Sequence, residues 1–460
     1  LHVRSRRQRQ MCIRDSAKVA QQEFERKFDQ KSTDSVVKAL CKVIYDNAEI
    51  LAREAVDETG MGRYEDKVAK NRNKSKGVWQ NLQGKKTMGV IDIEEGTGLI
   101  KIAKPVGVVA AITPTTNPIV TPMANIAFAL KTKNAIIVSP HPRSKNCSGH
   151  AIELIKGVLK EHKVPENLVQ YLAEPGLNET QELMSLVDVV VATGGMGMVH
   201  SAYSSGKPSF GVGAGNVQVI IDENINDFDE TAKIIIKGRA FDNGIICSGE
   251  QCFIYPKKYK EEIFEAFKRN GAYFVPEEYH DKMVNTIFVN GTISKDVVGK
   301  DVEIIAKMAG IEIPKDTRIL VVPAKGVAQA DLICKEKMCP VMTCLPYDHF
   351  DEAIALANAN LNMEGSGHSA GIHSNNQGNI IKAGNDIKVS RLIVNAPCSI
   401  TAGGSIQNGL SVTTTLGCGT WGNNSISENL TYKHLLNITR IARMSDTIHV
   451  PTDDEIWSMN

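Results

Sequence analysis

The feature that most constrains the fold is an alternation of short apolar runs with helical stretches that begins after Pro105. Two of these runs, NAIIV at 134–138 and DVVVA at 188–192, are apolar almost throughout, which is typical of parallel strands buried on both faces. Further strands are predicted at 106–112, 167–172 and 217–221. The alternation predicts an α/β fold with a doubly wound parallel sheet, an architecture that often binds nucleotides.

The flanking segments indicate further parts of the molecule. Residues 17 to about 76 show helical spacing, and 88–104 is typical of two strands around an acidic turn. A second α/β unit is predicted to begin near Glu223, with a helix at 228–239 and a strand at 251–256, and the tail is predicted to be helical at 430–443. We assign 17–88 and 105–222 to a dinucleotide-binding domain, 223–405 to a catalytic domain, and 89–104 and 406–460 to bridging or oligomerisation segments.

Composition narrows the classes of partner. The 460 residues carry a formal net charge of +1, so no electrostatic footprint for nucleic acid or an anionic membrane is expected. None of the ten cysteines shows the two-residue gap of a zinc knuckle, so we predict no metal site and reduced thiols in a cytoplasmic protein. Small molecules and sister subunits in a homo-oligomer, a dimer or tetramer, are the expected partners.

The first sixteen residues differ from the rest of the chain. LHVRSRRQRQMCIRDS carries five Arg against one Asp and shows neither helical nor strand periodicity. We predict that residues 1–16 are non-native or disordered and lie outside the fold. A basic targeting arm is the alternative, and association with a bacterial microcompartment stays open.

The sharpest local motif is FDNGIICSGEQC at 241–252. Cys247 follows Gly244 in a polar, turn-prone segment that leads into a strand, and loops of this kind hold reactive thiols. On spacing alone a buried structural cysteine is the better interpretation, because Cys is among the residue types most often buried.

Six motifs in one order change that balance. From about 34 to 443 the sequence resembles the aldehyde dehydrogenase superfamily and, within it, the coenzyme-A-acylating branch, which includes the N-terminal half of bifunctional aldehyde–alcohol dehydrogenases. The motifs are KPVGVVAAITPTTNP at 104–118, SPHPRS at 139–144, ATGGMGMV at 192–199, FGVGAGN at 210–216, the Cys247 segment, and TLGCGTWGNNSISEN at 415–429.

The resemblance implies roles for two residues in the chemistry. Cys247 matches the nucleophile, whose thiolate adds to the aldehyde carbon. Asn117 matches the side-chain donor to the resulting oxyanion, with the backbone N–H of Cys247 as the second donor. The alternative for Asn117 is that it only shapes the turn before Pro118.

The resemblance also implies a nicotinamide cofactor, NAD, on a Rossmann-like domain. Glu336 matches the carboxylate that holds the nicotinamide ribose, and its alternative is an exposed charge at a helix end. Arg143 and Lys145 leave NADP open. The other residues expected at the cofactor are Thr113, Pro114, Ser139, His141, Pro142, Thr193, Gly194, Gly195 and Gly213.

One absence points to the acyl acceptor. Hydrolytic relatives carry a water-activating Glu at the position of Gly211, and here no carboxylate lies between Lys207 and Asp222. Without that base a thiol, the better nucleophile toward a thioester, takes the acyl group, which implies coenzyme A as co-substrate.

Three residues are weaker candidates for the substrate pocket. His368 lies in a Gly/Ser-rich loop that the acylating branch shares, and a solvent-facing loop histidine is the alternative. Thr415 and Cys418 lie in a segment that resembles pocket-lining sequence of the family, although Cys418 is interpreted as structural.

The resemblance leaves several functions to compare. Acetaldehyde is the default aldehyde, and propionaldehyde, a C4 semialdehyde and sulfoacetaldehyde are alternatives. A hydrolytic aldehyde dehydrogenase is the nearest rival, and a cysteine acyltransferase or hydrolase without redox chemistry represents a different class.

Overall fold

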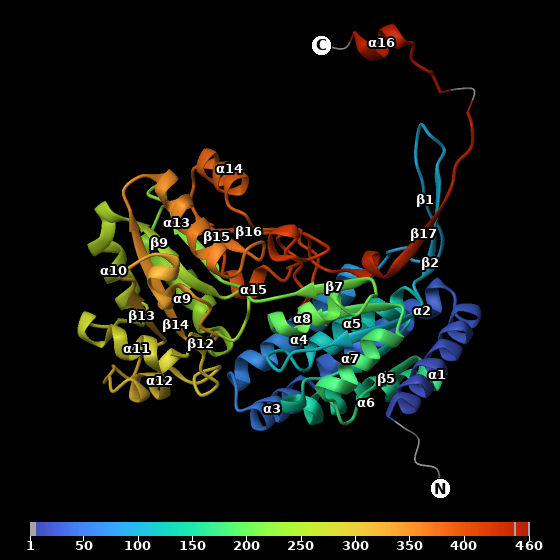
Figure 1. Ribbon diagram of the computed structural model, residues 1–460, viewed down its shortest axis with the longest axis horizontal. Helices are drawn as coiled ribbons and strands as arrows, with labels where there is room; N and C mark the ends of the chain where they lie inside the picture. Colours follow the sequence, from blue (N-terminus) through green and yellow to red (C-terminus); the bar gives the residue numbers. More distant parts are fainter. Residues whose placement is uncertain (1–5, 446–447, 459–460) are drawn as a thin grey trace.

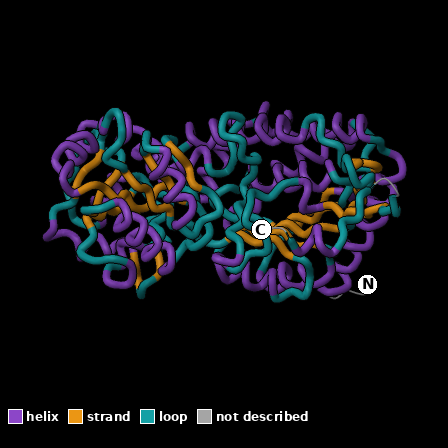
Figure 2. Tube along the Cα trace, turned by 90° about the horizontal axis from the view of Figure 1, so that it is seen from above, coloured by secondary structure: helices purple, strands orange, loops and turns teal. Residues whose placement is uncertain are grey.

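Two parallel sheets lie in two lobes side by side, and a narrow arm projects from one of them (Figures 1 and 2). The computed structural model describes residues 6–445 and 448–458, with side chains from Gln10 onward. The α/β fold class predicted from the sequence is confirmed. In the described part of the chain, no helix is both long and apolar enough to cross a bilayer.

The first lobe has five parallel strands in the order β5-β4-β3-β6-β7. Every residue of β3, β4 and β6 is buried, as the apolar runs predict. Its strands are β3 (Val108–Ile112), β4 (Ala135–Ser139), β5 (Val169–Tyr171), β6 (Val189–Thr193) and β7 (Ser209–Val212). Its helices are α1 (Arg6–Lys27), α2 (Gln30–Asp46), α3 (Ala48–Thr59), α4 (Tyr64–Leu82), α5 (Val120–Lys131), α6 (Lys145–Glu161), α7 (Leu177–Leu186) and α8 (Met196–Tyr203).

Helix α1 shows that residues 6–16 are part of the fold and not disordered as expected; that they are non-native stays a prediction. It begins at Arg6, Gln10 is 5% exposed, and Ile13 packs against the core of the first lobe. The side chain of Gln170 donates to the carbonyl of Ile13 at 3.0 Å. The buried face of α1, formed by Ala17, Ala20 and Phe24, continues toward the N-terminus to Gln10. Packing of this face on the first lobe therefore stabilises a helix that the spacing of residues 1–16 does not predict. Residues 1–5 lie outside the described part.

The second lobe has seven strands in the order β10-β13-β14-β9-β8-β15-β16. Strand β8 (Val217–Ile221) pairs with β9 and β15, so it belongs to this sheet and not, as expected, to the first. A buried apolar run has the same sequence pattern in either sheet, and only its partners distinguish them. The remaining strands are β9 (Glu250–Pro256), β10 (Ala272–Phe274), β13 (Ile319–Pro323), β14 (Val341–Tyr347), β15 (Ala370–His373) and β16 (Leu392–Val394).

Helices cover the second sheet, and a separate short hairpin pairs β11 with β12. The two faces of the sheet pack on different apolar clusters. The elements are α9 (Phe228–Ala240), α10 (Lys260–Arg269), α11 (His280–Ile287), β11 (Phe288–Val289), β12 (Thr292–Ile293), α12 (Val302–Met308), α13 (Phe350–Met363), α14 (Gln377–Asp386) and α15 (Cys398–Thr401).

The arm is a three-stranded antiparallel sheet (Figure 1). Strands β1 (Gly89–Ile93) and β2 (Ile100–Pro105) form the predicted hairpin, and β17 (Leu436–Ile441) pairs with the other edge of β2. The helix predicted at 430–443 is therefore wrong, because backbone bonds to β2 hold LNITRI extended. Beyond the arm lies the short helix α16 (Asp453–Trp457).

Candidate active site

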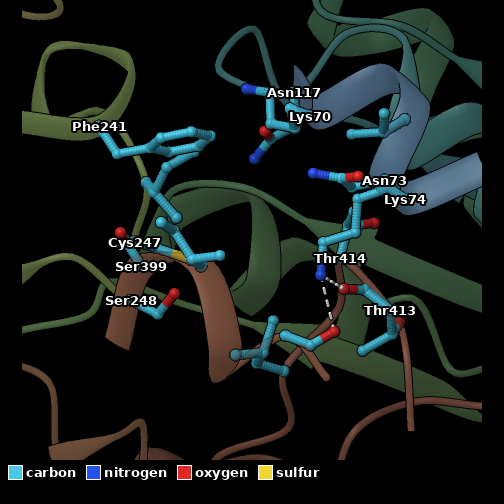
Figure 3. Close-up of a pocket in the computed structure, with 15 residues that line it drawn as sticks. Lys70, Asn73, Lys74, Asn117, Phe241, Cys247, Ser248, Ser399, Thr413 and Thr414 are labelled. Atoms are coloured by element: carbon cyan, nitrogen blue, oxygen red, sulfur yellow. Dashed lines mark hydrogen bonds between the residues drawn. The ribbon is translucent and has the colours of Figure 1, made fainter. Parts of the chain in front are cut away.

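A cavity of about 70 Å³, partly open to solvent, has Cys247 and Asn117 in its wall (Figure 3). Helix α4 and the segment after β3 form one side of it, and the Cys247 segment, α15 and residues 413–416 form the rest. The lining residues are Lys70, Asn73, Lys74, Asn117, Val120, Phe241, Ile246, Cys247, Ser248, Ser399, Ile400, Gly403, Thr413, Thr414 and Leu416. The sequence-predicted nucleophile and oxyanion donor are thus brought into one cavity.

The Cys247 segment reaches the pocket through an unusual turn. Asp242, Asn243 and Gly244 all have positive φ, at 50°, 52° and 68°. Gly244 is required there, because a Cβ would lie 2.5 Å from the carbonyl oxygen of Cys339. The turn directs Ile245 into the core and leaves Cys247 partly exposed in the pocket, whereas every other cysteine except the exposed Cys12 is buried.

The surroundings of Cys247 favour its neutral thiol. Burial raises its pKa to about 12, and the carboxyl group of Glu336 and the thiol of Cys418 add to the effect. The guanidinium of Arg391 acts in the opposite direction. The thiolate is therefore a minor form near neutral pH, and reaction requires that a proton leave the thiol.

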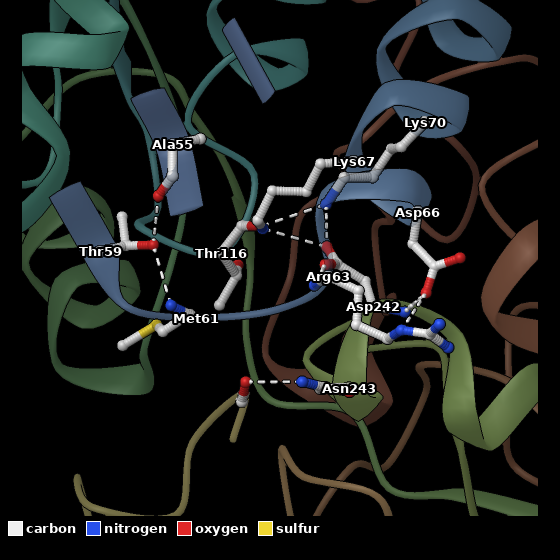
Figure 4. A network of polar contacts seen from close by, with 11 residues as sticks. Ala55, Thr59, Met61, Arg63, Asp66, Lys67, Lys70, Thr116, Asp242 and Asn243 are labelled. Carbon is white, nitrogen blue, oxygen red and sulfur yellow. Dashed lines mark hydrogen bonds and ion pairs between the residues drawn. The ribbon is translucent and has the colours of Figure 1, made fainter. Parts of the chain in front are cut away.

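A buried ion-pair network holds the turn against helix α4 (Figure 4). The carboxylate of Asp242 accepts from Lys70 at 2.6 Å, from Lys67 at 3.2 Å, and from the backbone N–H of Arg63 at 2.9 Å. Burial acts to raise the pKa of Asp242, but Lys70 and Lys67 outweigh it and hold that pKa below its usual value. Lys70 also donates to the carbonyl of Thr116 at 3.3 Å, so the network links the two segments that carry Cys247 and Asn117.

Asn117 lies half-buried between β3 and α5. Its carbonyl accepts the N–H of Thr121 at 3.2 Å in the first turn of α5, and its side chain lines the pocket (Figure 3). The position before Pro118 therefore shapes a turn and also presents an amide to the cavity of Cys247.

Gly215 lies next to three of the predicted site residues: Cys247, His368 and Glu336. A Cβ at Gly215 would lie 1.9 Å from the carbonyl oxygen of Cys247 and 3.3 Å from Cε1 of His368. Its N–H donates to Oε1 of Glu336 at 3.2 Å. Burial, reinforced by Glu364, raises the pKa of the half-buried Glu336 to about 8. The segment between β7 and β8 thus packs directly on the backbone of Cys247, and only glycine fits at position 215.

His368 is fully buried, which excludes the solvent-facing alternative. Burial and then Arg391 lower its pKa to about 3, so the imidazole is neutral at physiological pH. Its Nδ1 lies 3.1 Å from the Ser369 hydroxyl, while its Nε2 has no hydrogen-bond partner among the described residues. A neutral imidazole nitrogen beside the Cys247 segment is therefore available to form a hydrogen bond with a ligand.

The residues predicted to hold a cofactor gather at the carboxyl edge of the first sheet, where open α/β sheets bind ligands. Thr113 and Pro114 follow β3, Ser139 ends β4, and Thr193 ends β6. The N–H of Thr113 donates to the carbonyl of Ser139 at 3.1 Å, which holds two of these ends together. The hydroxyl of Thr113 is buried without a partner in the described chain and is available to a ligand.

The turn between β6 and α8 offers open backbone. A Cβ at Gly195, the N-cap of α8, would meet no atom within 4 Å, and one at Gly194 only Met198 at 4.0 Å. Space in front of backbone at a helix N-terminus suits a pyrophosphate. Gly213 lies close by, since its Cβ would approach the Met196 sulfur to 2.1 Å.

Other candidates lie around this edge. His141 caps the short turn Pro142–Ser144, with Nδ1 accepting the N–H of Arg143 at 3.1 Å, and burial and Arg143 lower its pKa. The hydroxyls of Thr193 and Thr415 lie 2.8 Å apart, so Thr415 contacts the cofactor edge. Cys418 is buried, with its Sγ 3.4 Å from the carbonyl of Leu416, which fits a structural residue.

Position 211 has no space for a side chain. A Cβ there would lie 2.6 Å from Cγ1 of Val199 and 2.9 Å from Cε2 of Tyr203. The N–H of Gly211 donates to the Tyr203 hydroxyl at 3.0 Å, which fixes the strand against α8. The residues that line the pocket include no carboxylate, so no general base for water faces Cys247 from its wall.

Sequence reasoning missed the basic side of the pocket. Lys70 and Lys74 project from α4, which shows only a generally basic stretch in the sequence. Arg391 donates to the carbonyls of His368 and Gly417, and no motif in the sequence marks it. A signal for Lys70 and Lys74 existed in their four-residue spacing, which places both on one helix face.

Comparison with known proteins identifies the family to which the chain is similar. The model of the family described as "Aldehyde dehydrogenase family" matches residues 3–411. Succinate-semialdehyde dehydrogenase (acetylating) of Clostridium kluyveri is 51% identical over 96% of this chain and 97% of its own length. An aldehyde-alcohol dehydrogenase of Clostridium acetobutylicum is 38% identical over 92% of this chain, which spans 49% of that protein. The crystal structure of an acetylating aldehyde dehydrogenase from Geobacillus thermoglucosidasius superposes with a TM-score of 0.93 at 37% identity, covering 97% of this chain and 98% of that one.

Proposed function

Because the chain belongs to the aldehyde dehydrogenase family, we propose that it oxidises a short aldehyde and passes the acyl group to coenzyme A through a thioester on Cys247. Aldehyde, coenzyme A and oxidised nicotinamide give acyl-coenzyme A, reduced nicotinamide and a proton. The relatives at 51% and 37% identity are both named acetylating, which supports this reaction over formation of a free acid.

Carbon–sulfur bond formation begins the reaction. The Cys247 thiol loses its proton and the thiolate adds to the aldehyde carbon, which places a negative charge on the former carbonyl oxygen. The side-chain amide of Asn117 and the N–H of Cys247 are the donors for that oxygen. Their common pocket supports the assignment.

A bound nicotinamide supplies the two-electron acceptor for the aldehyde carbon. The carboxyl edge of the first sheet fits such a cofactor, through the unpartnered Thr113 hydroxyl and the open backbone at Gly194 and Gly195. Glu336, held to Gly215, is the residue for the ribose hydroxyls. We assign NAD as the cofactor, and Arg143, exposed near this edge, makes NADP the alternative to assay.

Release of the acyl group is the step that separates the candidate functions. Attack of the coenzyme A thiol on the thioester carbon returns the electron pair of the carbon–sulfur bond to Cys247, and the thiol proton must be accepted. His368, neutral and with an unpartnered Nε2, is the group we assign to accept a hydrogen bond from that thiol, and the proton passes to solvent. The observation that carries the acylating function is the absence of a carboxylate in the pocket lining together with the packing that fills the space at Gly211.

An absorbance assay tests the proposal. Purified protein with aldehyde and NAD or NADP should produce reduced cofactor only when coenzyme A is added, for at least one of acetaldehyde, propionaldehyde, sulfoacetaldehyde and a C4 semialdehyde. Equal rates without coenzyme A would identify a hydrolytic aldehyde dehydrogenase. No reduced cofactor with any aldehyde would favour a cysteine acyltransferase or hydrolase.

The cellular form of the enzyme is part of the same proposal. We expect a cytoplasmic homo-oligomer, since no disulfide joins the described cysteines and the β1-β2-β17 arm projects from the body of the chain. Light scattering on the purified protein distinguishes monomer, dimer and tetramer. Whether the oligomer associates with a microcompartment is to be tested in cells.

A further inference from the structure

Among the residues that the structure describes, Lys74 is a cation of the pocket without an anionic partner. Its Nζ donates to the backbone carbonyls of Gly403 at 2.8 Å and Thr413 at 3.3 Å, and no carboxylate in the described chain lies within 4.0 Å of it. Its neighbours Lys67 and Lys70 by contrast share the carboxylate of Asp242. Two carbonyls leave the third ammonium proton and the full positive charge of Lys74 uncompensated.

Lys74 is half-buried, and loss of solvent lowers its pKa to about 8. The Cys247 thiol acts in the opposite direction, and Lys70 adds to the lowering. Lys67 and Lys70 share one carboxylate and Lys74 contacts none among the described residues, so this side of the pocket carries an excess of positive charge. An anion bound beside Lys74 would remove the imbalance, because a charge that has lost part of its solvent is more stable when it is paired and hydrogen-bonded.

Two hydroxyls in the same pocket supply a second and independent observation. Thr414 Oγ1 and Ser399 Oγ are buried, each residue being 8% exposed, and neither has a hydrogen-bond partner in the described part of the chain. Thr414 directly follows the residue whose carbonyl holds Lys74. Unpartnered buried hydroxyls in a cavity wall indicate a polar ligand, since buried polar groups are otherwise nearly always satisfied.

The nucleophile and the free cation face one cavity from different sides. Figure 3 shows Cys247 on one side of the pocket and Lys74 on the other, with the cavity between them. A substrate whose aldehyde carbon reaches Cys247 therefore directs its far end toward α4. Apolar side chains, Phe241 and Ile246 among them, line the path between the two ends.

We propose that the substrate is an aldehyde whose far end carries an anionic oxygen group, a carboxylate or a sulfonate, and that Lys74 is the residue that binds this group, with the Thr414 hydroxyl as a second donor. The inference rests on the proposed acylating function. It assigns the specificity of the pocket to a charge on α4, which is separate from the groups assigned to the chemistry at Cys247.

Matched pairs of aldehydes test the inference. Succinate semialdehyde and 4-methylpentanal have the same shape and differ in the charge of the terminal group, as do sulfoacetaldehyde and 3,3-dimethylbutanal. We expect kcat/KM with coenzyme A for one anionic aldehyde to exceed that for its neutral isostere by roughly 10- to 100-fold, the range of a hydrogen bond to a charged group. The better anionic aldehyde distinguishes a carboxylate from a sulfonate.

Variants locate the effect. Lys74→Met should lower the ratio of the anionic to the neutral kcat/KM by roughly 10-fold or more, and Lys74→Arg should restore part of it. Lys76→Met, at an exposed position of the same helix, serves as the control and should leave the ratio unchanged. Thr414→Val should lower the ratio of the anionic to the neutral kcat/KM by a smaller factor, because it removes a hydrogen-bond donor but no charge.

Three outcomes would overturn the inference. The first is that kcat/KM for each neutral isostere equals that for its anionic partner. The second is that Lys74→Met lowers kcat/KM for the anionic and the neutral aldehyde equally. The third is that Lys76→Met also lowers the ratio of the anionic to the neutral kcat/KM. The second outcome would give Lys74 a purely structural role in holding Gly403 and Thr413. A protein that shows no coenzyme-A-dependent reduction of cofactor with any aldehyde fails instead at the proposed function, so the two failures are distinguishable.

Discussion

At the scale of single residues, the Cys247 thiol is partly exposed to the pocket and has a raised pKa. It is partly exposed in a pocket, which suits a nucleophile, but burial and Glu336 raise its pKa to about 12. The two observations fit together if the thiol is ionised only when a substrate or cofactor changes its surroundings. The unliganded enzyme then protects the thiol from indiscriminate reaction.

The raised pKa predicts how Cys247 reacts with an alkylating agent. Since the thiolate is the reactive form and its pKa lies well above neutral pH, the thiolate fraction should rise about tenfold per pH unit. We expect the rate of Cys247 alkylation by iodoacetamide to rise without a plateau from pH 7 to pH 9, measured by mass spectrometry of the peptide that contains Cys247. The exposed Cys12 in the same sample is the internal comparison. A plateau below pH 8 would show that the free enzyme already stabilises the thiolate.

Asn117 provides a second prediction at this scale. Asn117→Ala removes one oxyanion donor and should lower kcat by roughly 10²- to 10³-fold with little change in the melting temperature. The exposed Asn146 supplies the control, and Asn146→Ala should behave as the wild type. If Asn117→Ala kept wild-type kcat, the amide would only shape the turn before Pro118.

At the scale of elements, the contact between β7 and α8 decides what position 211 can hold. The sequence alone left open that a glutamate there would activate water, provided the backbone tolerated it. The structure removes that option, because the Cβ direction at Gly211 is occupied by Val199 and Tyr203 of α8. Packing between a strand and a helix therefore excludes a water-activating group from this position.

A substitution at this contact tests the point. Gly211→Glu should destabilise the protein by about 1–3 kcal/mol or more, the usual cost of overpacking, and should not raise the rate at which free acid is formed. Urea unfolding and a coenzyme-A-free acid assay measure the two effects. Gly197→Glu on the exposed side of α8, where a Cβ meets no atom within 4 Å, controls for the added charge. A stable variant with increased acid formation would contradict the packing argument.

At the scale of the whole molecule, the Asp242 network joins parts of the chain that lie far apart in sequence. Helix α4 belongs to the first lobe, and the turn at Asp242–Gly244 leads into the Cys247 segment on the second (Figure 4). The ion pairs of Asp242 with Lys67 and Lys70 cross that junction, 175 and 172 residues away in the chain. Alignment of the pocket walls therefore depends on one buried carboxylate.

Removing that charge tests its importance. Asp242→Asn leaves Lys67 and Lys70 buried without an anion and should lower the free energy of unfolding by about 3–5 kcal/mol at neutral pH. The pKa of Asp242 lies below its ordinary value of 3.8, so its ion pairs stabilise the fold above that value and lose this contribution as the pH falls through the lowered pKa. The difference from wild type should therefore shrink in acid.

Urea titrations at several pH values measure this difference. Asp229→Asn, which breaks an exposed pair with Arg269, is the matched control and should change stability by less than about 1 kcal/mol. An Asp242→Asn variant as stable as this control would show that the network is not a structural junction.

The amino-acid sequence by itself determined the class of fold and the family. Runs such as DVVVA specify strands buried on both faces, and the motif order predicts the aldehyde dehydrogenase family, which comparison confirms. It also placed Cys247 and Asn117 as candidates, which prove to line one pocket. These features depend on residue type and on local spacing, so a single chain read in order contains them.

Only the tertiary structure decided the rest. The assignment of β8 to the second sheet and the extended state of β17 depend on which strands they pair with. Burial of His368 and the unpaired charge of Lys74 likewise depend on distant neighbours, since Lys74 meets Gly403, 329 residues away. The sequence determined which groups could react, whereas contacts between distant segments decided which are buried, charged or left without a partner, because burial and pairing are properties of the folded neighbourhood.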